Sequence, residues 1–220
     1  IPSKRHTVFK KKNSKNIYYE ELISRAGFSS LYSNVYHIHM PTQLKKIGSL
    51  NRFKNKTQLD CYKHRHIETD KIKNNGDIIT SRIKLFYNED VSVSVSSIKE
   101  ENIYFYKNAH HDELIYIQSG TGLFESNFGN LKLNKGDYLI VPRGIIWKLS
   151  DINKIKCLII ESKSPISTPN RYRNDFGQLM EHSPYCERDI VTPTFVAPKD
   201  EIGDFVIKIK YSEGIQSYTY

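Results

Sequence analysis

The sequence contains no long apolar run, and this absence bears on where the protein works. Apolar stretches such as residues 139–141 and 158–160 are far shorter than the roughly 20 residues that cross a bilayer as a helix. Residues 1–5 lead into basic residues, not into the apolar core and small-residue cleavage site of an export signal. We therefore expect a cytoplasmic protein without a membrane segment.

Cysteine is scarce, and common catalytic motifs are missing. The three cysteines, Cys61, Cys157 and Cys186, form no C-x-x-C pair, and their odd number favours free thiols in a reducing compartment over a disulfide framework. The chain has no P-loop, G-x-G-x-x-G, G-x-S-x-G or H-E-x-x-H motif and no internal repeat. Nucleotide-binding, serine-hydrolase, zinc-protease and solenoid classes therefore have no support.

The chain has a positive net charge, but its basic residues are not clustered as in a phosphate-binding surface. The net charge is +9, and part of it lies in Lys10, Lys11, Lys12 and Lys15. The other lysines are scattered, and the abundance of Lys, Asn and Ile is typical of an AT-rich genome. Because nucleic-acid binding depends on clustered basic residues, we expect no nucleic-acid partner.

The residue pattern predicts a mostly β fold. Val91, Val93 and Val95 alternate with serines, which is the period of two typical of a half-buried strand. Further strands are predicted at 78–87, 114–118, 122–125, 131–133, 137–141, 145–149 and 157–161. One short helix is predicted at 19–25, ended by Gly27. Many short strands divided by turn residues favour an antiparallel jelly-roll sandwich or barrel.

Two segments have the form of a cupin signature. Residues 136–147 read G-x5-P-x-G-x2 followed by Trp147, which stands where metal-binding cupins place a histidine ligand. An indole has no lone pair for a metal. We therefore predict that Trp147 fills the part of the barrel interior that a metal would occupy.

The first half of the signature also lacks its histidines. Residues 112–122 match it and place Glu113 at the acidic ligand. The two preceding ligand positions fall on Tyr106 or Lys107 and on Asn108 or Ala109. His110 and His111 are adjacent, and neighbours on a strand point to opposite faces, so we expect no shared metal ion there. The predicted fold is thus cupin-like, with no catalytic, cofactor-binding or metal-binding residue.

Other candidate ligands and nucleophiles are weaker. His37 and His39, and likewise His64 and His66, share one strand face but have no third ligand nearby, so structural or surface roles are favoured. Cys186 lies between His182 and the neighbours Glu187 and Arg188, an arrangement that could activate a thiol. A packed, unreactive Cys186 is the favoured interpretation.

Long segments of the chain resemble one family, the homogentisate 1,2-dioxygenases, and most of all its shorter bacterial branch. The resemblance runs nearly end to end. It is carried by KRHT at 4–7, YHIHMPTQ at 36–43, FYNEDVSVSVS at 86–96, DEL at 112–114, GDYLIVPRG at 136–144, RYRNDFGQL at 171–179 and SPYCERDI at 183–190.

The resemblance implies a two-barrel enzyme that opens the ring of homogentisate to maleylacetoacetate in tyrosine and phenylalanine breakdown. In the family, Fe(II) is held by two histidines and a glutamate in the C-terminal cupin half, and none of these positions maps onto this chain. The chain has no initiating Met and stops soon after a strand-like run at 205–211. We therefore expect a fragment, the non-catalytic N-terminal part of such an enzyme.

The expected organisation has three parts. Residues 1–76 form a β-rich N-terminal extension packed on the barrel, residues 77–162 form a degenerate cupin barrel, and residues 163–220 form a linker or wrapping arm toward the missing C-terminal half. The expected partners are that missing half, further copies in a homo-oligomer, and homogentisate and O2 in the whole enzyme. The alternative is a stand-alone degenerate cupin that serves as a binding or assembly module without catalysis.

Overall fold

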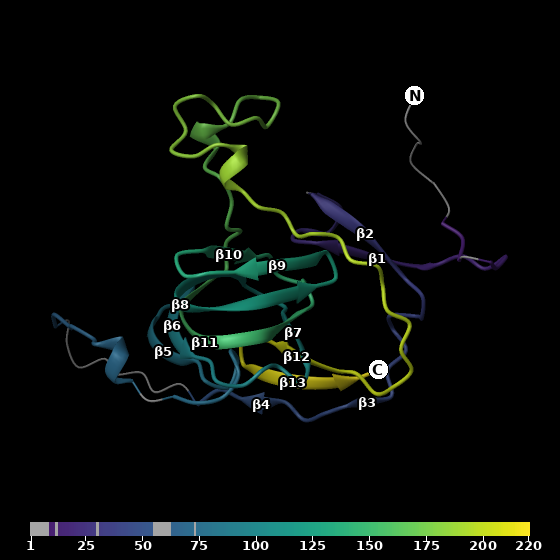
Figure 1. Cartoon of the computed structure of the whole chain (residues 1–220), viewed down its shortest axis with the longest axis horizontal. Helices are drawn as coiled ribbons and strands as arrows, with labels where there is room; N and C mark the ends of the chain where they lie inside the picture. Colours follow the sequence, from purple (N-terminus) through teal and green to yellow (C-terminus); the bar gives the residue numbers. More distant parts are fainter. Residues whose placement is uncertain (1–8, 12, 30, 55–62, 73) are drawn as a thin grey trace.

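Two long antiparallel strands, β8 (Asp112–Ser126) and β11 (Trp147–Ser162), form the centre of the computed structural model (Figure 1). The structure describes residues 9–11, 13–29, 31–54, 63–72 and 74–220, so residues 4–7, Lys12 and Cys61 of the sequence predictions lie outside it. Inward positions alternate along both strands, with Ile115 and Ile117 buried on β8 and Cys157 and Ile159 buried on β11.

Each long strand joins two segments that the sequence predicts as separate strands. Segments 114–118 and 122–125 belong to β8, and 157–161 and the end of 145–149 belong to β11. The ladder shifts register between Ser150 and Cys157 rather than ending. Gly120, at φ +86°, allows this, because a Cβ there would lie 2.5 Å from the carbonyl oxygens of Asn153 and Lys154. A bulge, not a turn, therefore stands at these residues.

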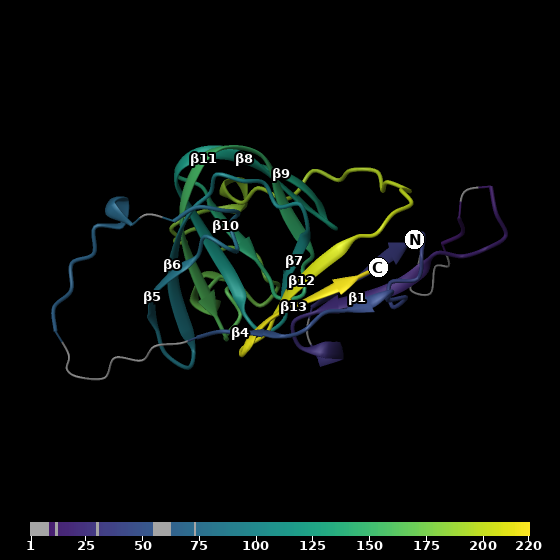
Figure 2. The same ribbon diagram turned by 90° about the horizontal axis from the view of Figure 1, so that it is seen from below.

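Within the described residues the main sheet contains eleven strands, and it curves strongly around the core (Figure 2). Hydrogen-bonded neighbours follow the order β10-β8-β11-β7-β12-β13-β3. Four further strands pair at the side of this order: β6 with β11, β5 with β6, β9 with β8 and β4 with β13. Its other members are β3 (Lys46–Ile47), β4 (Asn51–Arg52), β5 (Ile83–Tyr87), β6 (Val91–Ser97), β7 (Phe105–Asn108), β9 (Gly129–Leu133), β10 (Tyr138–Val141), β12 (Val206–Lys210) and β13 (Gly214–Thr219). Among the described strands β10 and β3 do not pair with each other, so the sheet is not closed. The predicted mostly β, cupin-like jelly-roll fold is confirmed in its sandwich form.

The core lies on the concave side of this sheet. Trp147 is fully buried, and its ring centroid lies 5.2 Å from that of Tyr106 and 5.4 Å from that of Phe124. Tilted and edge-on aromatic pairs of this kind add to the stabilisation that burial alone provides. The aromatic plug predicted at Trp147 is thus part of the hydrophobic core.

The helix predicted at 19–25 is wrong. Residues Tyr19–Ser24 form β1, which pairs with β2 (Tyr32–His37) in a separate two-stranded sheet around the 3-10 turn η1 (Gly27–Ser29). Leu22 and Ile23, expected on one helix face, point to opposite sides of the strand. Ile23 lies against the turn that follows β10. Its side chain is 3.8 Å from the position that a Cβ on Gly144 would occupy.

Residues beyond β11 leave the sheet and return to it. They contain the 3-10 turns η3 (Asn170–Tyr172) and η4 (Glu187–Asp189), and β12 then pairs in parallel with β7. The strand-like run at 205–211 is therefore β12. Strands from all three expected parts share the main sheet, while their boundaries stay a prediction.

Helical structure in the described residues is limited to short 3-10 turns, which include η2 (Thr69–Lys71). None of these turns has the length and apolar character that crossing a membrane requires.

Asp112, at the start of β8, connects three segments of the chain. Its buried carboxylate pairs with Arg143 Nε at 3.1 Å and with Arg25 Nη2 at 3.3 Å, and it accepts the backbone N–H of Ile166 at 3.0 Å. Arg25 follows β1, Arg143 lies in the turn after β10, and Ile166 follows β11. The position of the hairpin β1–β2 on the barrel is therefore fixed in part by one buried charge.

Candidate functional site

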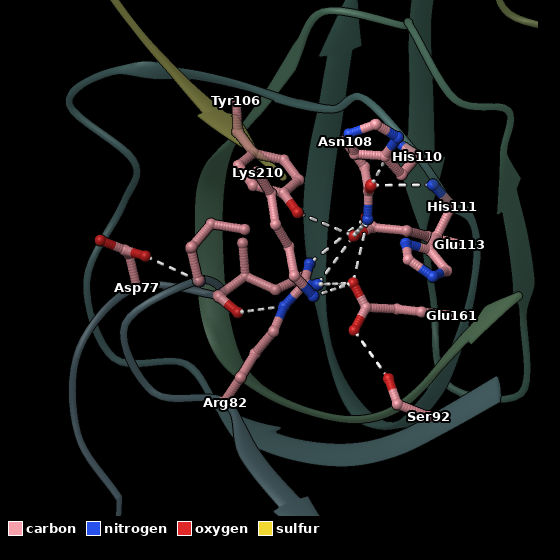
Figure 3. A network of polar contacts seen from close by, with 12 residues as sticks. Asp77, Arg82, Ser92, Tyr106, Asn108, His110, His111, Glu113, Glu161 and Lys210 are labelled. Atoms are coloured by element: carbon pink, nitrogen blue, oxygen red, sulfur yellow. Dashed lines mark hydrogen bonds and ion pairs between the residues drawn. The ribbon is translucent and has the colours of Figure 1, made fainter. Parts of the chain in front are cut away.

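A buried network of charged groups surrounds Glu113, the acidic position of the cupin signature (Figure 3). Glu113 comes from the start of β8, and Arg82 directly precedes β5. The guanidinium donates to the Glu113 carboxylate from Nη1 at 2.8 Å and from Nη2 at 3.3 Å. Tyr106 Oη donates to it at 2.9 Å and Asn108 Nδ2 at 3.0 Å, both from β7. The Glu113 side chain is only 1% exposed, so every hydrogen bond comes from the protein.

A second carboxylate, Glu161 of β11, completes the network. It accepts from Arg82 Nη1 at 3.3 Å, from Asn108 Nδ2 at 3.0 Å and from Ser92 Oγ at 2.9 Å, and it forms an ion pair with Lys210 of β12. Glu113 and Glu161 are direct cross-strand partners. Like charges in that relation repel, so the bridging guanidinium and the ammonium make the arrangement stable.

The protonation of the network follows from these contacts. Burial disfavours the charged form of Glu161, but Arg82, Lys210 and the hydrogen bonds outweigh it and hold its pKa at about 2. Burial likewise disfavours charged Arg82, yet Glu113, with Tyr106 and Glu161, raises the pKa of the guanidinium well above its ordinary value. Burial and the Glu113 carboxylate raise the pKa of Tyr106. Near pH 7 the network therefore contains an ionised Glu161, a charged Arg82 and a neutral Tyr106 phenol.

These residues do not fit an iron ion. Two of the places expected for histidine ligands, Tyr106 and Asn108, point N–H or O–H donors at Glu113, and Trp147 is packed in the core. The oxygens of Glu113 already accept from three side chains. Over the described ranges, no three His, Cys, Asp or Glu side chains are grouped so that they could hold a metal. Arg82 supplies the positive charge beside Glu113 that a metal would supply elsewhere.

A pocket of about 580 Å³ opens above this network. Glu161 and Lys210 of the network form part of its wall. Its lining combines cations, aromatic rings and two histidines with few carboxylates: Lys84, Arg143, Lys163, Lys210, Glu89, Glu161, Phe53, Tyr87, Tyr211, His110, His111, Asn88, Val91, Ser92 and Ser212. Pockets that bind small organic molecules usually have volumes of about 300–1,000 Å³, and this pocket falls within that range.

His110 and His111 lie in the turn between β7 and β8, not on a strand as the alternation argument assumes. The backbone N–H groups of both donate to Asn108 Oδ1, at 3.2 and 3.0 Å, and both side chains line the pocket. Burial, together with Lys210, lowers the pKa of His111, although Glu161 opposes the shift. Asn108 therefore ties the pocket histidines to the buried carboxylates.

The other predicted histidines serve structural or surface roles. His37 Nε2 bonds to Glu21 at 2.8 Å across the hairpin, and His39 Nε2 bonds to Asp200 at 2.8 Å. His64 and His66 are exposed. The two members of each pair share no ligand in the described part of the chain.

Neither cysteine in the described part of the chain, Cys157 or Cys186, is paired with a base. Burial raises the pKa of Cys157 to about 12, so its thiol stays protonated. The backbone N–H of Cys186 donates to the Asp189 carboxylate at 2.9 Å, at the start of η4. The His182 ring packs on Tyr172, and no hydrogen bond joins it to Cys186 in the described residues.

Sequence reasoning did not find Arg82, Glu161 or Lys210. Arg82 is 79 residues from Glu161 in the sequence, and Glu161 is 49 residues from Lys210. The three side chains meet only when β5, β11 and β12 come together. One signal was available, because buried Ile155, Cys157 and Ile159 continue with period two to Glu161. A carboxylate at an inward position requires a cation in the interior.

The chain is similar to two named dioxygenases. It is 37% identical over 218 residues, or 98% of its length, to the protein named "Putative dioxygenase SSO1533" of Saccharolobus solfataricus. It spans 56% of that protein, about half of its length. It is 27% identical over 173 residues, 71% of the chain, to acireductone dioxygenase of Sclerotinia sclerotiorum, of which it covers 85%. No protein-family model matches the chain.

Solved structures similar to the chain include two cupins. A cupin protein from Bacteroides fragilis matches at 18% identity over 51% of this chain and 92% of its own, with a TM-score of 0.37. A cupin-2 domain protein from Shewanella frigidimarina matches at 22% identity over 37% of this chain and 79% of its own, with a TM-score of 0.34. By sequence, the chain is similar to proteins named as dioxygenases.

Proposed function

We propose that this chain is the non-catalytic N-terminal part of an Fe(II)-dependent homogentisate 1,2-dioxygenase. In this proposal the iron lies outside residues 1–220, in a second cupin half, and the whole protein opens the aromatic ring of homogentisate with O2. The segment contributes packing and subunit contacts. It supplies no metal ligand.

The observation that carries this proposal is the Arg82–Glu113–Glu161 network. In it Glu113, at the acidic position of the cupin signature, already accepts from Arg82, and Tyr106 and Asn108, at two of the histidine positions, also donate to it, so these residues leave no ligand set for iron. The 98% coverage of the chain in its match to a longer protein named as a dioxygenase supports a position within a larger enzyme. The strings that resemble homogentisate dioxygenases support the substrate.

The proposal is tested on the gene that encodes this segment. We expect its reading frame to continue past the Tyr220 codon and to encode a histidine and glutamate ligand set. The complete product should bind one iron per chain and consume O2 when homogentisate is added. A stop codon directly after Tyr220 would contradict the proposal, and O2 uptake with another aryl acid but not with homogentisate would contradict the substrate.

The role of the segment is tested by Tyr106→Phe in the complete product. This change removes one donor to Glu113 and keeps the ring that packs on Trp147. We expect the rate of O2 uptake to stay within about twofold, because the network does not touch the reacting atoms. A loss of turnover with unchanged iron content and melting temperature would show that the network belongs to the catalytic site.

A further inference from the structure

The two long strands of the main sheet carry apolar side chains on both of their faces. On β8, Leu114 and Tyr116 flank the core residue Ile115. On β11, Leu158 and Ile160 occupy the matching outward positions. Successive side chains of a strand point to opposite faces, and the water-facing side of an antiparallel sheet is normally polar. The outer side of these two strands therefore has the composition of a buried surface.

The valines of β6 lie on the same outer side. Ser92 Oγ of this strand donates to Glu161 inside the buried network at 2.9 Å, so the serines point inward and the valines point outward. Val93 is the cross-strand partner of Ile160. The outer side of β6 thus continues the apolar surface of β11.

Strand pairing extends this surface over five neighbouring strands. The strands pair in the order β10-β8-β11-β6-β5, and cross-strand partners share a face. We call the resulting surface the outer apolar face. Its members are Tyr138 and Ile140 of β10, Leu114 and Tyr116 of β8, Leu158 and Ile160 of β11, Val93 of β6 and Phe86 of β5. Among the described residues, no member of this face belongs to the hydrophobic core.

The outer apolar face is covered near its centre and open at its two edges. Val95, beside the face on β6, is buried, whereas Tyr138 and Ile140 on β10 are 67% and 47% exposed and Phe86 on β5 is 47% exposed. The Tyr138 ring packs on that of Tyr116, with 4.7 Å between centroids. Contiguous apolar patches and fixed aromatic side chains are typical of protein–protein contacts. The face therefore has the features of an interface.

The charge of the chain restricts which surface two copies can share. The net charge is +9, so two copies repel each other wherever their basic surfaces meet. A two-fold contact places a patch against the same patch of the partner, so a charged patch meets its own sign. No member of the outer apolar face is charged. Two twisted sheets of this kind also pack face to face at about 10 Å, with their strands about 30° apart.

The size of the face sets the strength of the contact. Strands lie about 4.8 Å apart, and outward residues follow at about 7 Å along each strand, so the face measures roughly 24 Å by 14 Å. Two such faces, with the relief and rim of their side chains, bury on the order of 1,000 Å², which is the lower end for specific contacts. The expected dimer therefore dissociates readily.

We infer that the outer apolar face is the contact surface of a two-fold dimer, in which it packs on the same face of a second copy of this chain. The inference concerns assembly, and it holds whether or not the complete protein opens an aromatic ring.

The test is sedimentation equilibrium of the 220-residue chain over a wide range of concentration. We expect a reversible monomer–dimer equilibrium with a Kd on the order of 10–100 μM, as suits an interface of this size. Tyr138→Lys with Ile140→Lys places like charges on both sides of the contact and should weaken the dimer at least tenfold. A monomer at all concentrations up to about ten times that Kd, or a dimer that these changes leave intact, would overturn the inference.

A matched variant separates this face from general charge repulsion. Phe176→Lys with Ile202→Lys adds the same charge at side chains that are 90% and 102% exposed and lie outside the outer apolar face. We expect the Kd of the dimer to change less than twofold. Weakening equal to that of the Tyr138 and Ile140 pair would show that the face has no special role and would overturn the inference.

Chemical labelling locates the contact in the unchanged chain. Tyr138 should be nitrated by tetranitromethane several-fold more slowly when the protein concentration rises above the Kd, because the dimer covers its ring. Tyr32, which is 55% exposed on the hairpin β1–β2, should keep its rate. Peptide mapping measures both rates. Equal slowing of the two tyrosines, or no slowing of Tyr138, would contradict a contact at this face.

Discussion

At the scale of single residues, Arg82 is the cation at the centre of the buried network. It joins two carboxylates from neighbouring strands and is itself only 9% exposed. A guanidinium differs from a metal in being covalently attached and in offering directed N–H donors rather than open coordination positions. It therefore stabilises the interior without offering a place for substrate or O2.

Replacing Arg82 with Met should leave Glu113 and Glu161 facing each other with too little positive charge. Breaking a buried ion pair by removing one partner costs about 3–5 kcal/mol, so we expect a fall of that size in the free energy of unfolding. Urea titration measures it. Arg52→Met on β4, where the residue is exposed, should change stability by less than about 0.5 kcal/mol. Equal effects of the two changes would mean that the network adds nothing.

The pH dependence of stability should identify Glu161. Its pKa is about 2 in the folded chain and 4.5 in an ordinary environment, so its ionised form stabilises the fold fully above about pH 4.5. This contribution is lost as the pH falls toward 2. The difference in free energy of unfolding between the unchanged chain and Glu161→Gln should therefore shrink between pH 5 and pH 2. A constant difference across this window would contradict the assignment.

The thiol of Cys157 should be inert in the folded chain. Its side chain is fully buried and its pKa of about 12 leaves almost no thiolate at pH 8. Peptide mapping after iodoacetamide treatment should find Cys157 unmodified in the native protein and modified in urea. Modification of Cys157 at a rate similar to that of the less buried Cys186 would show that β11 opens more readily than its packing implies.

At the scale of elements, the hairpin β1–β2 depends on the buried carboxylate of Asp112. Asp112→Asn weakens the ion pairs to Arg25 and Arg143 and leaves the side chain nearly unchanged in size. We expect faster hydrogen exchange in residues 19–37 and 163–172, with protection of β8 and β11 retained. Mass spectrometry of the exchanged peptides measures this, with the exposed Asp175→Asn as control. Uniform loss of protection would mean that Asp112 supports the core instead.

Sequence pattern predicted the elements unevenly, and the reasons are physical. The alternation of Val and Ser predicted β6, but Ser94, Val95 and Ser96 are all buried, so the strand is covered on both faces and is not half-buried as predicted. The pattern failed at 19–25, where strand pairing with Tyr32–His37 overrides the helical spacing of Leu22 and Ile23. The sequence pattern predicted β8 and β11 each as two strands separated at Gly or Asn, because β-bulges and turns favour the same residue types. It found Glu113 and Trp147 but not Arg82, whose role depends on distant strands.

At the scale of the whole molecule, the curved sheet separates two kinds of interior. Aromatic and aliphatic side chains around Trp147 fill one part, and the paired charges fill the part below the pocket. Glu161 and Lys210 connect the charged part to the pocket. The open, curved sheet thus encloses an ion network beside its hydrophobic core, with a pocket above the network.

Because protein charges fill the interior around Glu113, we expect this chain to bind no iron. The most direct test is elemental analysis of the 220-residue chain after anaerobic reconstitution with Fe(II) and removal of unbound metal. We predict far less than one iron per chain and no homogentisate-dependent O2 uptake. One iron per chain, lost when Glu113 is changed to Gln, would contradict the account.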